Sequence, residues 1–330
     1  MAEPQIRYEA GQTSRPFEVL SSEDNKVFAA SFRPWSDVTG FAPVVAPNGL
    51  MTGGAISPDT GDDAVKVAAL TARMAGVDGA DANGILAVAQ ATGLTITRGT
   101  APSDHVINSI TIDSTGTVAV VDGTPGESFA EGRGTAGGPP YIPVDSIEIG
   151  QVRVSDEAAA PITESEILAV PGLHVERADF PVWQTDFGRG QIEFAEALPL
   201  IHTGDEPKEV WLRAATPLFA PIPNTSDWTP AESTYTINST DTYDGPVGSA
   251  SSSLNQASFT AVLKDGITDA FVASKGKNIW FEFRPDRDKT TPRQLTQGIL
   301  GISRSFPAGG GNFTASCTVT PRSETVDESE

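Results

Sequence analysis

The side chains that could do chemistry in this chain are mostly carboxylates, and histidine and cysteine are scarce. The chain has 43 Asp and Glu residues against three histidines and one cysteine. His105, His174 and His202 are too far apart in the sequence for one element to present two of them to a metal ion. A zinc site is therefore not expected.

Two groups of aspartates and one pair of glutamates have the residue types of a calcium site or an acid–base pair. The groups are Asp59, Asp62 and Asp63, then Asp78 and Asp81, and the pair is Glu193 and Glu196. Neither aspartate group has the closing glutamate of a calcium-binding loop, so we expect solvated turns. The glutamate pair fits acid–base work in a carbohydrate-cleaving cleft, but so many acidic residues make accidental pairs inevitable. A carbohydrate-active enzyme is kept only as a remote alternative.

Sequence motifs for nucleotide binding and for serine hydrolases are absent. There is no phosphate-cradling GxxxxGK[ST] loop, and Gly188-Arg189-Gly190 lacks the third glycine and the preceding strand of a dinucleotide-binding turn. The GxSxG turn that exposes a nucleophilic serine is also missing. We therefore expect a protein that is not an enzyme, with no catalytic, cofactor-binding or metal-binding residue.

The composition indicates β-structure around a real core. The 330 residues are 38% hydrophobic, which suggests about two domains, and 32 Gly and 25 Pro with many Thr, Ser and Val favour strands joined by turns. The net charge of −21 argues against a nucleic-acid binder that neutralises phosphates. The plain interpretation of this acidity is a solvated surface that resists aggregation.

The single cysteine and the hydropathy of the sequence indicate where the protein is made. Cys317 lies on the apolar side of an alternating run and is expected to be a small core residue, with no disulfide framework. The N-terminus has no basic segment followed by an apolar run, and no stretch of eighteen apolar residues occurs. We expect a soluble protein made in the cytoplasm.

The C-terminal stretch from Ser258 to Pro321 gives the clearest pattern. Apolar residues at i, i+3 and i+4 predict a short α-helix over 265–276, capped by Asp265 and ended by Gly276. Alternation predicts strands over 278–284 and 313–319, each with one face packed and one face meeting water or a neighbour.

Residues 51–178 have a different texture, with few aromatic residues and short β-like runs. The best predicted strands are 94–98, 106–112, 117–121 and 147–154, with a hairpin turn at Asp113–Gly116 and a bulge at Gly150. The run 62–76 fits either a helix or a strand, and the β-like runs that follow it in the sequence slightly favour the strand. Thr163 to Glu166 is a capping box, and Gly123–Pro140 is expected to be a flexible surface loop.

Two segments are candidates for contacts between subunits. Residues 217–253 form a long polar excursion that is too long for an idle loop, with Trp228, Tyr235 and Tyr243 outside any obvious core. The turn Asp286, Arg287, Asp288 and Lys289 carries charges of both signs. It is either a solvated loop or a contact in which opposite charges fix the register of neighbours.

The order of elements in the C-terminal part resembles the major tail protein, the tail tube subunit, of long-tailed bacteriophages. The resemblance rests on Ser258–Leu263, Asp265-Gly266 opening a short helix, Asn278–Phe283, Gln297–Ile302 and Phe313–Val319. It covers Pro181 to Pro321, with residues 1–50 as an arm and first strand, and does not clearly include 51–178. It is a match of order and texture, since no catalytic motif is involved.

The resemblance implies a mainly β protein: a barrel or sandwich of two sheets with one flanking short α-helix, whose copies form rings that stack into a hollow tube. On this basis 1–50 is the arm and first strand, 51–178 an additional small β-rich domain outside the tube, 179–323 the tube-forming domain and 324–330 a mobile acidic tail. Strand edges not blunted by prolines would pair across subunits, and a lumen lined by carboxylates would let DNA slide.

The expected partners are other copies of the chain, tail proteins at the tube ends and DNA in non-specific passage, without membrane insertion. The expected location is the virion tail, after synthesis in the host cytoplasm. The alternative is another virion component, such as a baseplate, fibre or decoration protein, that binds a host glycan or a capsid through 51–178.

Overall fold

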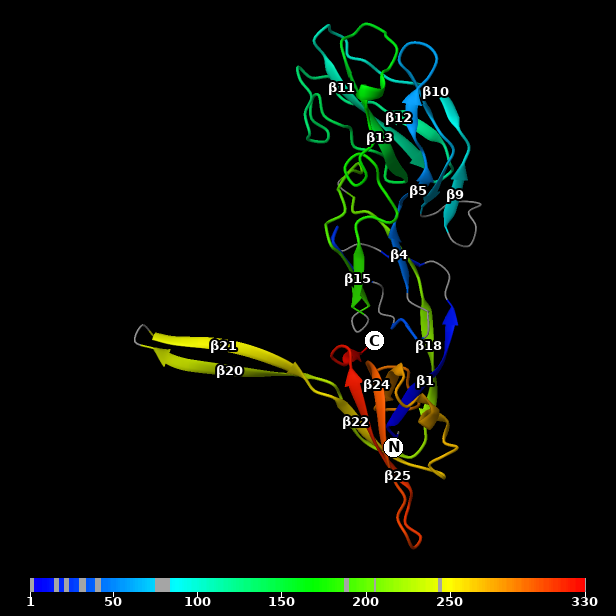
Figure 1. Cartoon of the computed structure of the whole chain (residues 1–330), viewed down its shortest axis with the longest axis vertical. Coiled ribbons are helices and arrows are strands. Elements are labelled where there is room, and N and C mark those ends of the chain that lie inside the picture. Colours follow the sequence, from blue (N-terminus) through cyan, green and yellow to red (C-terminus); the bar gives the residue numbers. More distant parts are fainter. Residues whose placement is uncertain are drawn as a thin grey trace.

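The computed structural model describes residues 3–14, 18–20, 24–29, 34–38, 43–74, 84–186, 190–204, 206–242 and 245–329. Strands dominate these ranges, and the helices among them are two 3-10 helices, η1 (Glu164–Glu166) and η2 (Ala270–Ser274). The molecule is elongated and has three tiers along its long axis (Figure 1). We call them the upper tier (49–178), the middle tier (18–47 with 181–214) and the base tier (5–14 with 215–328). The predicted mainly β class is confirmed.

The base tier is built on one antiparallel sheet. Its order is β18 (Ala215–Ile222), β1 (Gln5–Ser14), β23 (Asn278–Arg284), β24 (Arg293–Ser305), β25 (Thr314–Pro321), β22 (Ala257–Val262) and β19 (Thr225–Thr229), with β26 (Val326–Glu328) also on β24. Strands β18 and β19 stand at opposite ends of this order although only Pro223 and Asn224 separate them. The sheet therefore curls. In the described residues its end strands pair with β1 and β22 and not with each other, so it is not a closed barrel.

The curled sheet encloses a hydrophobic cluster. On β25, Ala315, Cys317 and Val319 are fully buried while Ser316 is exposed, which confirms the predicted half-buried strand. Cys317 is a free thiol in this core, as predicted. Phe259 on β22 and Phe281 on β23 meet across the cluster with their ring centroids 6.0 Å apart.

Strand β23 has the predicted bounds, but it is buried on both faces. The indole nitrogen of Trp280 donates a hydrogen bond of 2.9 Å to the carbonyl oxygen of Trp35, and its backbone nitrogen donates to the Glu9 carboxylate. Glu282 is also fully buried. The expectation that this face meets water or a neighbour is wrong, because residues 34–38 and a group of arginines cover it.

The predicted α-helix over 265–276 is also wrong. The structure has a turn followed by the five-residue helix η2, which begins after Asp269, and Ile267 is exposed while Phe271 is buried. The Asp265 carboxylate accepts from the backbone nitrogens of Ile267 and Thr268, and the Asp269 carboxylate accepts from that of Gly266. These side chains compete with helical hydrogen bonds and fold the segment into turns.

The middle tier contains two small antiparallel sheets. One joins β15 (Trp183–Asp186), β16 (Gln191–Phe194) and β3 (Val27–Ala29), and the other joins β2 (Glu18–Leu20), β17 (Val210–Arg213) and β4 (Val44–Pro47). Phe28 and Phe194 pack edge to face with centroids 5.5 Å apart, and Trp35 is buried in the same cluster. These sheets connect the other two tiers.

The upper tier has a hydrophobic cluster of its own, drawn from Leu50 to Val175. Its sheets are β5 (Gly49–Gly53), β8 (Leu70–Arg73) and β9 (Ile85–Val88); β10 (Ala91–Thr95), β7 (Ala64–Val67) and β6 (Ile56–Pro58); and β12 (Val118–Val121), β11 (His105–Asp113), β13 (Ser146–Ser155) and β14 (Ile167–Leu168). Strands β11, β12 and β13 lie where the sequence predicts them. The strand preference for 62–76 is confirmed as two strands, β7 and β8, while residues 75 and 76 lie outside the described ranges.

Three local predictions in the upper tier are confirmed. Gly150 pairs with Ile110 and Glu148 with Thr111, so Ile149 is the extra residue of a bulge. The turn after β11 is closed by the Asp113 nitrogen donating to the Thr117 oxygen over 3.1 Å. At η1, the Glu166 carboxylate accepts from the backbone nitrogen of Thr163, as in a capping box.

Candidate functional site

A two-stranded ribbon projects from the base tier. Strands β20 (Ser233–Thr242) and β21 (Gly245–Leu254) pair antiparallel over ten residues each, and the ribbon extends away from the body (Figure 1). Most of the predicted polar excursion 217–253 is therefore strand, since it also contains β19 and the last six residues of β18. The ribbon is the clearest candidate for a contact with another molecule.

The register places Tyr235, Ile237, Ala250 and Leu254 on one face together with Ser233 and Ser252, and threonines opposite serines on the other; we call these the apolar face and the hydroxyl face. Residues directly opposite in an antiparallel pair share a face. Tyr235 is opposite Ser252 and Ile237 is opposite Ala250, whereas Thr234 and Thr236 are opposite serines on the other face. Tyr235 is 74% exposed and Ile237 is 77% exposed, so the apolar face is open to solvent.

The three aromatic residues predicted to contact neighbours have different environments. Tyr235 lies on the open apolar face of the ribbon. Trp228 packs against the core of the base tier, stacked on Phe283 with centroids 5.8 Å apart and donating to the Gln294 side chain over 2.7 Å. The premise that Trp228 lies outside the core is therefore wrong. Tyr243 lies outside the described residues.

The turn 286–289 pairs with its own chain. Lys289 lies 3.8 Å from Asp286, and Arg287 lies 3.7 Å from Glu3 and 3.9 Å from Asp288. The Arg287 backbone nitrogen also donates to the Glu3 carbonyl oxygen. Arg287, Asp288 and Lys289 are exposed, Asp286 is half-buried, and all are paired within the subunit; their role in a contact between subunits stays a prediction.

The end strands of the base-tier sheet carry the residues that block strand addition. Pro217 and Pro221 lie in β18 at the end of the sheet, and proline has no amide hydrogen to donate to a further strand. At the other end, β19 has only five residues, an irregular register, and Asp227 at φ 61°. The expectation of edges without prolines is wrong.

A cluster of ion pairs on β23 and β24 is formed entirely within the chain. The buried Glu282 carboxylate is paired with Arg284 at 2.5 Å, Arg293 at 3.0 Å and Arg7 at 3.3 Å. Arg293 also pairs with Glu328 on β26. Residues 326–328 of the predicted mobile tail are thus held as a strand against β24.

The upper tier is joined to the middle tier by two chain segments that lie side by side. Leu50 and Arg177 form a parallel bridge, in which the Leu50 nitrogen donates to the Glu176 oxygen and the Ala178 nitrogen to the Leu50 oxygen. A Cβ atom at Gly49 would lie 2.3 Å from the Arg177 carbonyl carbon, so only glycine allows this approach. The entry and exit of the upper tier are therefore adjacent.

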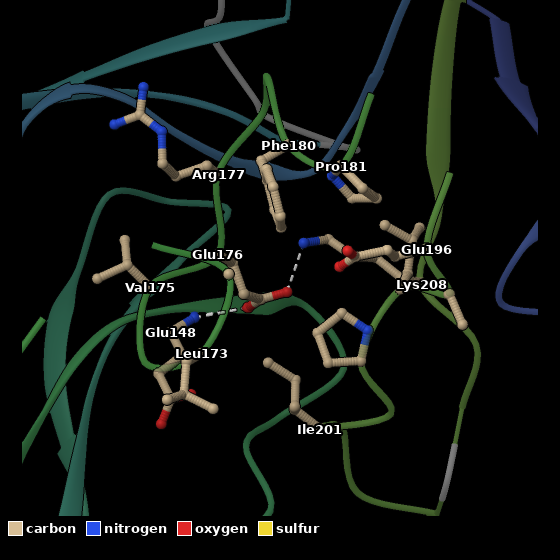
Figure 2. A pocket seen from close by; sticks show the side chains of 14 residues that line it. Glu148, Leu173, Val175, Glu176, Arg177, Phe180, Pro181, Glu196, Ile201 and Lys208 are labelled. Carbon is tan, nitrogen blue, oxygen red and sulfur yellow. Dashed lines mark hydrogen bonds and ion pairs between the residues drawn. The ribbon is translucent and has the colours of Figure 1, made fainter. Parts of the chain in front are cut away.

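A small pocket of about 90 Å³ lies at this junction, with a buried ion pair in its wall (Figure 2). Lys208 Nζ, from the segment before β17, lies 2.5 Å from Glu176 Oε1. The other carboxylate oxygen of Glu176 accepts from the backbone nitrogen of Glu148 on β13 over 2.7 Å. Glu176 is 5% exposed and Lys208 is 3% exposed. One carboxylate thus ties the upper tier to the middle tier.

The Glu148 side chain continues the polar network beneath the pocket. It accepts from Ser109 Oγ at 2.5 Å and from Gln151 Nε2 at 3.2 Å, and it pairs with Arg133. Burial raises the pKa of Glu148, and the Arg133 guanidinium opposes that shift. Arg133 comes from the predicted loop 123–140, which has no strand of its own; the flexibility expected of that loop stays a prediction.

Apolar side chains surround the mouth of the junction pocket. Leu173 and Phe180 line it, and Leu173 also lines an adjoining groove of about 360 Å³ together with Tyr141 and Leu200. All four are at least 36% exposed, and Leu173 is 63% exposed. We call Tyr141, Leu173, Phe180 and Leu200 the apolar rim.

The residues considered for chemistry are dispersed. His202 is buried with Nε2 3.1 Å from the Ser146 oxygen, and burial lowers the pKa of His174. Glu193 pairs with Lys26 on the middle-tier sheet, whereas Glu196 lines the junction pocket. The described residues hold no group of three or more His, Cys, Asp or Glu placed for a metal ion.

The described aspartates Asp59 and Asp63 make contacts within the upper tier. Asp59 accepts from the backbone nitrogens of Thr60 and Gly93, which lowers its pKa. Asp63 pairs with Arg98 at 2.5 Å and is not a solvated turn residue. Asp78 and Asp81 lie outside the described residues.

Comparison with known proteins does not identify the chain. No protein-family model matches it, and no curated protein matches it. No helix within the described ranges is long and apolar enough to cross a bilayer.

Proposed function

We propose that this protein is a structural subunit that self-associates through the β20–β21 ribbon, and that its rings stack into the tail tube of a long-tailed bacteriophage. It acts without catalysis and without a cofactor. The observation that carries the proposal is the ribbon itself, because its apolar face is open and it has no core of its own. A two-stranded ribbon is marginal in water, and packing against a partner stabilises it.

The curled base-tier sheet supports the same proposal. It curls around one core, and the ribbon lies between β19 and β22 in the chain, so each copy presents one long arm beside the base tier. The resemblance of 181–321 to tail tube subunits supplies the specific assembly. A tube built from a chain of net charge −21 would repel the DNA that passes through it.

A second candidate is a different virion component that binds a host glycan or a capsid. The observation in its favour is the upper tier, which has its own hydrophobic cluster and lies at the far end of the molecule from the ribbon (Figure 1). Binding of the full chain to bacterial envelopes, lost when 51–178 is removed, would favour this candidate.

The test is assembly of the purified full chain, followed by sedimentation and negative-stain microscopy over a range of concentrations. We expect rings or tubes from the wild type and their loss when Tyr235 and Ile237 are both replaced by serine. The matched control replaces Thr234 and Thr236 on the hydroxyl face by serine. Monomers at every concentration, or assembly unchanged by the double substitution, would refute the proposal.

A further inference from the structure

If copies self-associate through the ribbon, as proposed above, another surface of the chain must receive it. We infer that the apolar face of the ribbon of one copy docks on the apolar rim of a second copy. The rim and its two adjoining cavities form a groove, since both cavities share Gly172, Leu173, Pro199 and Ile201.

The distribution of charge favours contact between the ribbon and the apolar rim. Two copies of net charge −21 repel each other, so contact is favoured where charges are absent or already neutralised. Between residues 233 and 254 the sequence has only two charged residues, Asp241 and Asp244. Of the carboxylates that line the groove, Glu176 pairs with Lys208, Glu148 with Arg133 and Glu131 with Arg153, so Glu196 is the one that adds negative charge at the edge of the junction pocket among the ion pairs of the described residues.

Composition and size agree with this match. Protein interfaces are depleted in charge and enriched in tyrosine at their centre. The ribbon places Tyr235 and Ile237 two residues apart on one face, where they can enter a groove lined by Leu173 and Leu200. Ten residues of strand span ~33 Å, and the ribbon extends away from the body (Figure 1).

The geometry also fits a ring. The ribbon and the rim are different surfaces, one in the base tier and one at the junction of the upper and middle tiers. Contact between them is head to tail, and such contacts generate closed rings or open filaments rather than isolated dimers.

The experiment places the photo-cross-linker benzoylphenylalanine at position 237 of the full chain and mixes it with isotope-labelled wild type. We expect cross-links from labelled to unlabelled copies that map to residues 172–182 or 199–201. The matched control has the cross-linker at position 236, on the hydroxyl face, and is expected to give few links there. Links between copies that map elsewhere would overturn the docking surface and leave the proposed function standing. Failure to self-associate would overturn both.

A second measurement uses exposed residues, which can change without loss of the fold. Leu173→Ser is expected to weaken self-association at least tenfold, measured by sedimentation. Ile267→Ser is the control, because Ile267 is 75% exposed on the base tier, away from the groove. Equal affinity of Leu173→Ser and the wild type would overturn the inference.

Discussion

Lys208 is the residue whose replacement most directly tests the junction. Glu176 and Lys208 are both almost fully buried, so Lys208→Met leaves a carboxylate without its cation in the interior. Removing one partner of a buried ion pair costs ~3–5 kcal/mol. The double variant Lys208→Met with Glu176→Gln removes both charges and keeps an oxygen that can accept from the Glu148 nitrogen, so we expect it to recover most of that loss.

Hydrogen exchange is the suitable assay because a chain with three tiers need not unfold in one step. A loss of ~3 kcal/mol speeds exchange through local opening by about 150-fold, at 1.36 kcal/mol per factor of ten. The effect should fall on the amides of Leu50, Glu148 and Ala178, which bond across or beside the junction. Base-tier amides should keep their protection.

The matched control is Lys26→Met. Lys26 and Glu193 lie 3.5 Å apart but are about half exposed, so their pair contributes no more than ~1 kcal/mol. Two results would refute the reasoning: exchange at the junction less than fivefold faster in Lys208→Met, or a double variant as damaged as the single one.

Three further predictions concern single sites. Burial raises the pKa of Cys317 to about 12, so alkylation at pH 8 should be at least 100-fold slower in the native protein than in urea; fast native labelling would contradict this. Hydrogen bonds from the Thr268 hydroxyl and nearby amides lower the pKa of Asp265 from 3.8 to about 2. Because the pKa of Asp265 is lower in the folded than in the unfolded protein, its ionised carboxylate stabilises the fold above pH ~4, and this stabilisation is lost as the pH falls through 2. The melting temperature of Asp265→Asn should therefore differ from that of the wild type at pH 5 and match it at pH 2. Gly49→Ala should destabilise the junction by ~1–3 kcal/mol in thermal melting, because its Cβ would overlap the Arg177 backbone; Gly11→Ala, with its nearest contact at 3.7 Å, is the control and should melt like wild type.

Local patterns in the sequence predicted the local structure well. The alternation around Cys317 predicts which side of β25 is buried, and the change of phase at Gly150 places a bulge next to its extra residue, Ile149. Both predictions depend on which way side chains point along a single strand, and in a strand successive side chains point to opposite faces. The polar excursion 217–253 contains most of the ribbon, and of the three aromatic residues predicted to contact neighbours, Tyr235 lies on the ribbon, whereas Trp228 packs against the core.

The errors arose where distant segments or side chains compete with a local pattern. Trp280 and Glu282 alternate as a solvent face would, but residues 34–38 and three arginines cover them. The junction pair of Glu176 and Lys208 was missed because nothing in the sequence spacing links two residues that meet only in the folded chain. The prediction of an α-helix over 265–276 was wrong because the Asp265 and Asp269 carboxylates accept hydrogen bonds from nearby backbone nitrogens and so stabilise turns.

The proline-bearing end strand of the base tier has a consequence for the behaviour of the protein at high concentration. Stacking of like strands into fibrils requires a donor at every second residue along the edge, and Pro217 and Pro221 interrupt that row. The two prolines therefore disfavour fibril growth by strand addition at this edge. In the proposed assembly, copies are joined instead by a separate element, the ribbon, and each copy offers one rim to receive it.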